Sequence, residues 1–185
     1  MKRAAFIAAL GLMLPVAAVA AETPTPDSYG AAMRWYERAA EAGSAKAQFY
    51  LGLMHETGQG RPADPAAALG WYRRAAEQGF AMAQFKVGLF LDRGTGAAVD
   101  ARAAASWYEK AASQGFAPAQ YNLGLLYAEG RGVDRDVASA WAWLDRAAAK
   151  LPEAAAARDQ LAGIMTDEEL EAARAKARAP ASPSP

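Results

Sequence analysis

Four tryptophans divide the chain into equal lengths, because Trp35, Trp71, Trp107 and Trp143 are each 36 residues apart. The residues around them also recur: Trp-Tyr is followed two residues later by Ala-Ala three times, and the last unit reads Trp-Leu instead. A fixed period of about 20–50 residues is typical of a solenoid, whose units bury their apolar faces only against neighbouring units. The spacing therefore predicts a repeat architecture with an extended binding surface rather than a closed catalytic pocket.

The first 21 residues have the composition of a secretory signal peptide. Lys2 and Arg3 precede an apolar run over residues 4–19, and Ala18 and Ala20 are small residues of the kind that signal peptidase requires. A membrane anchor is the alternative, but the run is shorter than the ~20 residues of a spanning helix. We therefore expect export to a bacterial periplasm, with no membrane span after removal of residues 1–21.

The charge and cysteine content exclude several classes of protein. The chain has 20 Lys and Arg against 20 Asp and Glu and no basic run, which argues against a nucleic-acid partner. It has no cysteine, so a lipid anchor on cysteine and disulfide bonds are both excluded. The fold must be stabilised by packing alone.

Each unit is predicted to contain two helices joined by a glycine-rich loop. The leading helix is predicted over residues 29–42 and ends at Gly43, a residue type that closes helices in the left-handed conformation. The second helices are predicted over residues 45–57, 81–93 and 118–129, each followed by Gly-x-Gly. The residues expected to cap the next helices are Asp64, Asp100 and Asp136.

The predicted fold is all-α, a solenoid of paired helices with 36-residue repeats. Residues 22–28 form a linker in which Asp27 or Ser28 can cap the first helix, and residues 29–150 form the array. Full repeats are expected at about 44–79, 80–115 and 116–151, capping helices at 152–178, and a disordered tail at 179–185. A capping box at Thr166 and Glu169 opens the last helix.

The repeat resembles the Sel1-like repeat, a relative of the tetratricopeptide repeat, over residues 29–150. The third unit carries the pattern best, at Ala117, Pro118, Ala119, Gln120, Leu123, Gly124, Tyr127, Gly130, Gly132, Val133 and Asp136. The resemblance implies a right-handed superhelix of antiparallel helix pairs that serves as a scaffold for protein partners. Bacterial members often act in envelope assembly, polysaccharide production or signalling. Some cysteine-rich relatives bind or hydrolyse β-lactams, and the absence of cysteine here argues against that branch.

By the same resemblance, one arc of the second helices lines a concave groove. Phe49, Phe85 and Tyr121 are predicted to form an aromatic ladder there, bordered by mixed charge, which suits an extended peptide or an amphipathic helix. The alternative is that these rings, and the leucines at 53, 89 and 125, pack between adjacent repeats. The candidate partner-binding residues are Lys46, Phe49, Glu56, Met82, Phe85, Asp92, Arg93, Tyr121 and Glu129.

No catalytic, cofactor or metal site is predicted. His55 is the only histidine, and a repeat position otherwise occupied by Leu91 and Tyr127 favours a packed core residue. Carboxylates at 56, 92 and 129 could meet along the groove as paired acids, but solvated rim charges are far more common.

The sequence therefore predicts a non-enzymatic scaffold, adaptor or regulator in the bacterial cell envelope. Two alternatives stay open. One is a cell-wall-active or β-lactam hydrolase, and the other is a carbohydrate-binding module whose concave aromatic rings stack on sugars.

Overall fold

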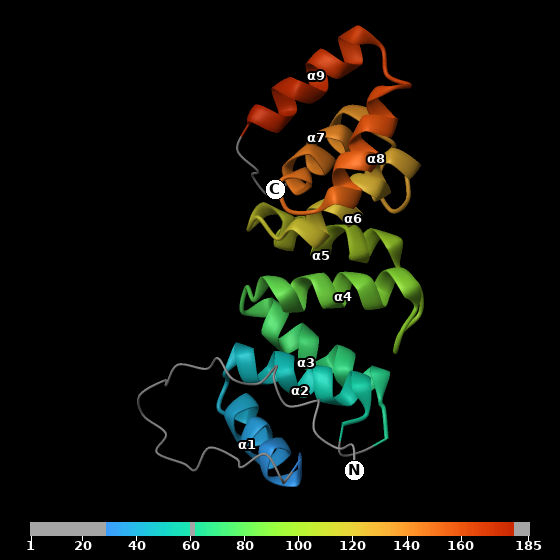
Figure 1. Ribbon diagram of the computed structural model, residues 1–185. Coiled ribbons are helices and arrows are strands. Elements are labelled where there is room, and N and C mark those ends of the chain that lie inside the picture. Colours follow the sequence, from blue (N-terminus) through green and yellow to red (C-terminus); the bar gives the residue numbers. More distant parts are fainter. Residues whose placement is uncertain (1–28, 60–61, 180–185) are drawn as a thin grey trace, which may run out of the picture.

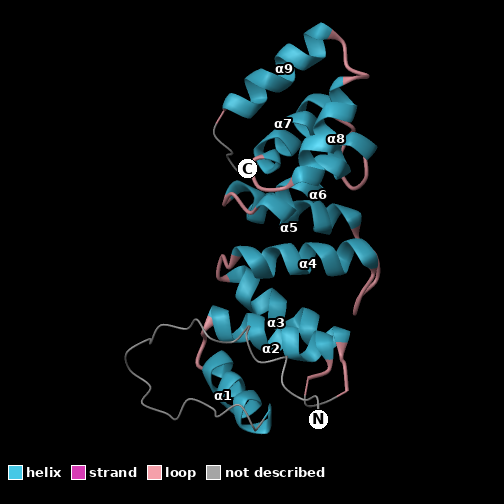
Figure 2. Ribbon diagram, viewed as in Figure 1, coloured by secondary structure: helices cyan, strands magenta, loops and turns pink. Residues whose placement is uncertain are grey.

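The computed structural model describes residues 29–59 and 62–179, and within these ranges it contains nine helices and no strand (Figures 1 and 2). The helices are α1 (Tyr29–Glu41), α2 (Ala45–Thr57), α3 (Pro65–Glu77), α4 (Ala81–Arg93), α5 (Ala101–Ser113), α6 (Ala117–Glu129), α7 (Val137–Ala148), α8 (Pro152–Ala162) and α9 (Asp167–Arg178). The predicted signal peptide and linker lie outside the described residues, as does the tail from residue 180. None of the described helices is long and apolar enough to span a membrane.

The helices stack in chain order along one column (Figure 1). Within each repeat α2 packs on α3, α4 on α5 and α6 on α7. Between repeats α3 packs on α4, α5 on α6 and α7 on α8. The predicted all-α solenoid of 36-residue units is confirmed.

The predicted helix ends are confirmed at the positions that the repeat assigns to them. Asp64, Asp100 and Asp136 each accept a hydrogen bond from the backbone N–H three residues on, at 2.9, 2.9 and 3.0 Å. These bonds satisfy N–H groups that a helix start leaves unpaired. The glycines that end α2, α4 and α6 have φ near +70°, a conformation that favours glycine. The capping box at the start of α9 is also present.

A tyrosine ring seated over a glycine joins the two helices of a repeat. Tyr72 and Tyr108 are both 0% exposed, more deeply buried than the tryptophans before them. A Cβ atom added to Gly52 or Gly88 would lie 2.7 Å from the Tyr72 or the Tyr108 ring, respectively. Only glycine lets the ring approach this closely, which explains why glycine recurs at positions 52 and 88.

The tryptophans that mark the repeat period carry a cation on one ring face instead. The Arg74 guanidinium lies 4.5 Å from the Trp71 ring centroid, and the Lys110 ammonium lies 4.1 Å from that of Trp107. Both rings remain half-buried. Cation–π contacts at such sites contribute about 0.5–1 kcal/mol.

Buried glutamines link neighbouring repeats by hydrogen bonds. Gln48, Gln84 and Gln120 are buried, and each Nε2 donates to the carbonyl of the alanine eight residues earlier, at 3.0, 3.2 and 3.0 Å. Gln78 and Gln114 then donate to the free Oε1 of the first two, at 2.7 Å in each case. Because buried amides need partners, this chain of bonds fixes the register of successive repeats.

The array closes with a helix that departs from the repeat geometry. α9 packs on α7 (Figure 1) and buries only Ala173. Its Lys176 ammonium donates to Asp136 at 2.6 Å and to the Ser139 hydroxyl at 2.8 Å. The Arg146 guanidinium donates to the last carbonyls of α9, at 2.9 Å from that of Lys176. A cation at a helix C-terminus also complements the helix dipole.

The tyrosine seat predicts opposite effects for two Gly→Ala substitutions. Gly88→Ala should lower the free energy of unfolding by about 1–3 kcal/mol, because its methyl group overlaps the Tyr108 ring. Gly70→Ala, exposed in α3 with nothing within 4 Å of its added Cβ, should raise it by about 0.5–1 kcal/mol. Urea unfolding of both variants tests this prediction. Equal changes in the free energy of unfolding would contradict the close contact between Gly88 and the Tyr108 ring.

The contact between α9 and α7 predicts a pH-dependent term in stability. Burial raises the pKa of Asp136, but hydrogen bonds from Lys176 and Ser139 outweigh it and hold the pKa at about 2, below the ordinary 3.8. The ionised carboxylate therefore stabilises the fold above pH 4, and this contribution is lost as the pH falls from about 4 to 2.

Asp136→Asn should flatten the melting temperature against pH in that window, since asparagine still caps α7. Asp64→Asn is the matched control, because it removes a capping carboxylate that Lys176 does not bind. A profile for Asp136→Asn that parallels the native one would refute the assignment.

Candidate protein-binding face

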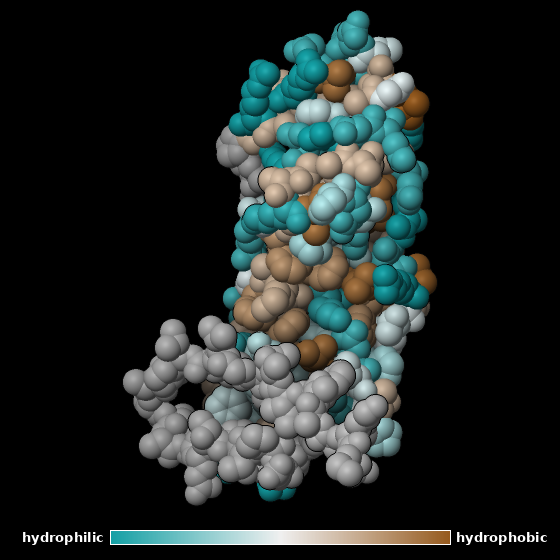
Figure 3. Space-filling model, viewed as in Figure 1, coloured by the Kyte–Doolittle hydropathy of each residue, from teal (hydrophilic) through white to brown (hydrophobic). Residues whose placement is uncertain are grey.

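The nine candidate residues lie on three alternate helices, α2, α4 and α6, and the surface of these helices is named here the even-helix face. The residues are Lys46, Phe49 and Glu56 on α2, Met82, Phe85, Asp92 and Arg93 on α4, and Tyr121 and Glu129 on α6. Lys46, Met82, Arg93 and Glu129 are exposed, and Phe49 is only 8% exposed. Hydrophobic and hydrophilic residues are interspersed on the visible side of the array (Figure 3).

The aromatic rings of this set pack into the next repeat. The Phe49 ring centroid lies 5.5 Å from that of Tyr72 and 5.3 Å from that of Phe80. Phe85 repeats the arrangement 36 residues later, at 5.8 Å from Tyr108 and 5.3 Å from Phe116. Tyr121 is half-buried against the apolar clusters of α7 and α8.

The buried Phe49 ring thus packs into the array, as in the alternative that the sequence left open, whereas Phe85 and Tyr121 remain partly exposed. The physical reason is that each ring fills the space between a helix pair and the helix that follows. Stacking on a sugar needs an open ring face, which the 8% exposed Phe49 does not offer.

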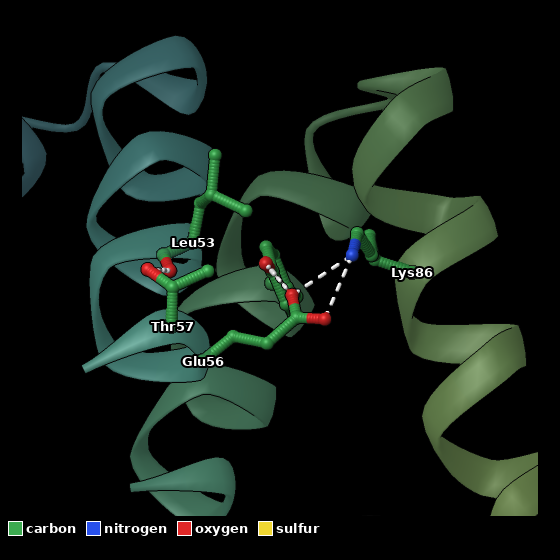
Figure 4. A network of polar contacts seen from close by, with 5 residues as sticks. Leu53, Glu56, Thr57 and Lys86 are labelled. Carbon is green, nitrogen blue, oxygen red and sulfur yellow. Dashed lines mark hydrogen bonds and ion pairs between the residues drawn. The ribbon is translucent and has the colours of Figure 1, made fainter. Parts of the chain in front are cut away.

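Three leucines remain on the even-helix face. Leu53, Leu89 and Leu125 recur at the 36-residue period and are partly exposed. Within the described residues they belong to none of the apolar clusters that form the core. Figure 4 shows Leu53 beside Glu56 on the side of α2 that faces α4. These three partly exposed side chains, which recur at one position of successive repeats, are named here the leucine row.

A polar contact, here called the first junction, joins α2, α3 and α4. The Tyr72 hydroxyl donates to Glu56, and the Lys86 ammonium donates to both oxygens of the same carboxylate, at 2.9 and 2.8 Å (Figure 4). Burial, and then the hydrogen bond to Glu56, raises the pKa of Tyr72 well above its ordinary range. Every polar group of this junction is paired, and the carboxylate is still 27% exposed.

The corresponding second junction, between α4, α5 and α6, is built differently. Asp92 stands where Glu56 stands, but its carboxylate is bound by Arg131 from the loop after α6. Arg131 also donates to Glu129, at 3.1 Å. The buried Tyr108 hydroxyl makes no hydrogen bond within the described part of the chain. Burial raises the pKa of Tyr108 to about 12, partly offset by the nearby Asn122 side chain.

These junctions were not predicted from the sequence. Tyr72 and Tyr108 read as packing residues because they keep the repeat phase, and Lys86 and Asn122 lie one residue from the predicted aromatic positions. Residues 50, 86 and 122 occupy the same position in successive repeats, but they are tyrosine, lysine and asparagine. This difference was the sequence feature that could have indicated the junctions.

The carboxylates at 56, 92 and 129 are held by two sets of partners. Glu56 binds a phenol and an ammonium group, whereas Asp92 and Glu129 share one guanidinium. His55 is buried, as predicted for a packed core residue. Across the described ranges no three His, Asp or Glu side chains gather as metal ligands.

The two junctions predict different effects of removing equivalent hydroxyl groups. Tyr72→Phe should lower the free energy of unfolding by about 1.5–3 kcal/mol, because it deletes a hydrogen bond to a charged group. Tyr108→Phe should leave stability unchanged or raise it, because its hydroxyl is buried without a partner in the described chain. Denaturant unfolding of this matched pair is the test, and equal losses would contradict the difference between the junctions.

The comparisons with known proteins agree with the repeat geometry. The Sel1 repeat model matches residues 24–44, 45–80, 81–116 and 117–150. The fold is similar to that of c5321, a protective antigen present in uropathogenic Escherichia coli strains that displays an SLR fold. The two are 35% identical with a TM-score of 0.73, over 79% of this chain and 32% of that chain.

A Sel1 repeat protein from Oxalobacter formigenes is 40% identical, with a TM-score of 0.68 over 72% of this chain and 39% of that chain. The chain thus spans well under half the length of either solved structure. The search of curated proteins gave no match. Four matched repeats and the fold they build show that this chain belongs to the Sel1 repeat family.

Proposed function

We propose that the chain is an exported scaffold or adaptor that binds a protein partner along its even-helix face, in the bacterial cell envelope. Sel1 repeats generally mediate protein–protein interaction. The observation that supports this face is the leucine row, three apolar side chains that lie outside the core clusters of the described residues. A partner that covers them gains the burial energy of about 25 cal/mol for each Å² of apolar surface.

The surroundings of the leucine row suit an extended segment or one face of a helix. The first and second junctions place ion pairs beside the leucines, with side chains that are 15–55% exposed. An apolar strip edged by partly exposed polar groups is the arrangement of a protein-binding patch, because the rim excludes water from the centre. Recognition would then combine apolar contact with Leu53, Leu89 and Leu125 and polar contact with residues that differ between repeats.

Export is supported by the basic start and apolar run of residues 1–21, which have the composition of a secretory signal. An envelope location would bring the face into contact with periplasmic proteins.

Capture of the partner by matched variants tests this function. The full chain, expressed with residues 1–28, is recovered from the periplasmic fraction, and its mass should show that the signal is gone. The native chain should then retain a discrete partner from a periplasmic extract, and Leu89→Arg should lose it. Val99→Arg is the control, since Val99 is 65% exposed in the loop between α4 and α5.

Melting temperatures of all three proteins separate lost binding from lost folding. Equal capture by native protein and Leu89→Arg would remove the leucine row as the binding surface. Recovery of the uncleaved chain only from the cytoplasm would remove the envelope role.

A further inference from the structure

We propose that the second junction binds a carboxylate of the partner, which accepts hydrogen bonds from the Tyr108 hydroxyl and from the neighbouring cationic and amide groups. This inference rests on the proposed function, because it names a chemical group that the even-helix face would recognise. Two repeats of the chain hold the same tyrosine in different surroundings. The Tyr72 hydroxyl donates to a carboxylate, whereas the Tyr108 hydroxyl has no acceptor among the described residues.

The first junction shows which group belongs beside this tyrosine. Tyr72 donates to the Glu56 carboxylate, which also accepts two bonds from Lys86. Position 92 is the counterpart of position 56, and aspartate is one methylene shorter than glutamate. The Asp92 carboxylate is turned to Arg131 instead. The second junction thus keeps the buried tyrosine, but its neighbouring carboxylate is bound by Arg131 and does not accept a hydrogen bond from the Tyr108 hydroxyl.

The groups around Tyr108 are mainly donors. Its own hydroxyl is buried, and its proton has no acceptor within hydrogen-bond distance among the described residues. The Asn122 amide lies beside it, and the charges of Asp92, Arg93 and Arg131 all act on it. Both carboxylates of this region, Asp92 and Glu129, already accept from Arg131. A donor-rich site that lacks an acceptor is complementary to an anion with two oxygens.

The acceptor position is accessible from the protein surface. At the first junction the Glu56 carboxylate is 27% exposed although it binds a fully buried tyrosine. The equivalent place at the second junction is bordered by Arg131, whose side chain is 45% exposed on the loop after α6. A partner carboxylate would approach Tyr108 by displacing the partly exposed Arg131 side chain. Leu89, which lies one turn of α4 before Asp92, would contact the apolar residues beside that carboxylate.

Peptide selection followed by a double-mutant cycle tests the site. Random twelve-residue peptides are selected on the full chain and resynthesised with amidated ends, and their Kd is measured by isothermal titration calorimetry. Replacing one Asp or Glu of a selected peptide by its amide should weaken binding to the native protein by about tenfold or more. On Tyr108→Phe the same replacement should change Kd by less than about twofold, because the coupled hydroxyl is gone.

Asp92→Glu gives an independent arm. The longer carboxylate should reach Tyr108 as Glu56 reaches Tyr72, so the melting temperature should rise while the acid-dependent part of peptide binding is lost. Tyr72→Phe is the control for both arms, since the first junction is already filled by Glu56. It should lower stability and leave the acid dependence unchanged. Peptides with a free C-terminus show whether the carboxylate is that of a side chain or of a chain end.

Three outcomes would overturn the inference. Acid-dependent binding that Tyr108→Phe and Asp92→Glu leave intact places the carboxylate elsewhere. Peptides that bind without any acidic residue, but are lost on Leu89→Arg, leave the proposed function standing and overturn the carboxylate site. Failure to select any peptide, together with failure to capture a partner, removes the function as well.

Discussion

The close approach of a tyrosine ring to a glycine sets the geometry on which the other contacts of the array depend. Because Gly52 and Gly88 have no side chain, the following helix lies close enough for the ring to be fully buried. That distance brings the Tyr72 hydroxyl to the Glu56 carboxylate, and the Gln78 Nε2 within 2.7 Å of the Gln48 Oε1 of the same repeat. In the pair of α6 and α7, Leu144 takes the place of the tyrosine over Gly124. The close contact is therefore kept, but no hydroxyl group is present.

Features encoded by short stretches of sequence were predictable. An aspartate before a helix and a glycine after one act through backbone groups three or four residues away, so their roles at Asp64, Asp100 and Gly94 follow from position alone. The 36-residue period then ordered these signals into helix pairs. The helices and their caps were therefore within reach of the sequence.

Features that depend on the rotation of a helix about its axis, or on partners far away in the sequence, were not predictable. A few tens of degrees decide whether Phe49 and Phe85 line a groove or fill the space before the next helix, and an arc on a helical wheel is wider than that. The contact between Glu56 and Lys86 spans 30 residues, and the pairing of Asp92 with Arg131 spans 39. Neither distance is a multiple of the repeat, so the period could not indicate them.

The attachment of α9 decides how long the array can become. Asp64 and Asp100 cap their own helices, and Arg74 and Lys110 stack on the tryptophans of those same helices. Their counterparts Asp136 and Arg146 also bind α9. A further unit built on α8 would have to displace α9 from both residues before its own second helix could take its place. The contacts of α9 with α7 thus cap the solenoid at this end. Duplication of an internal repeat could lengthen the array, whereas a repeat added after α8 would have to break these contacts.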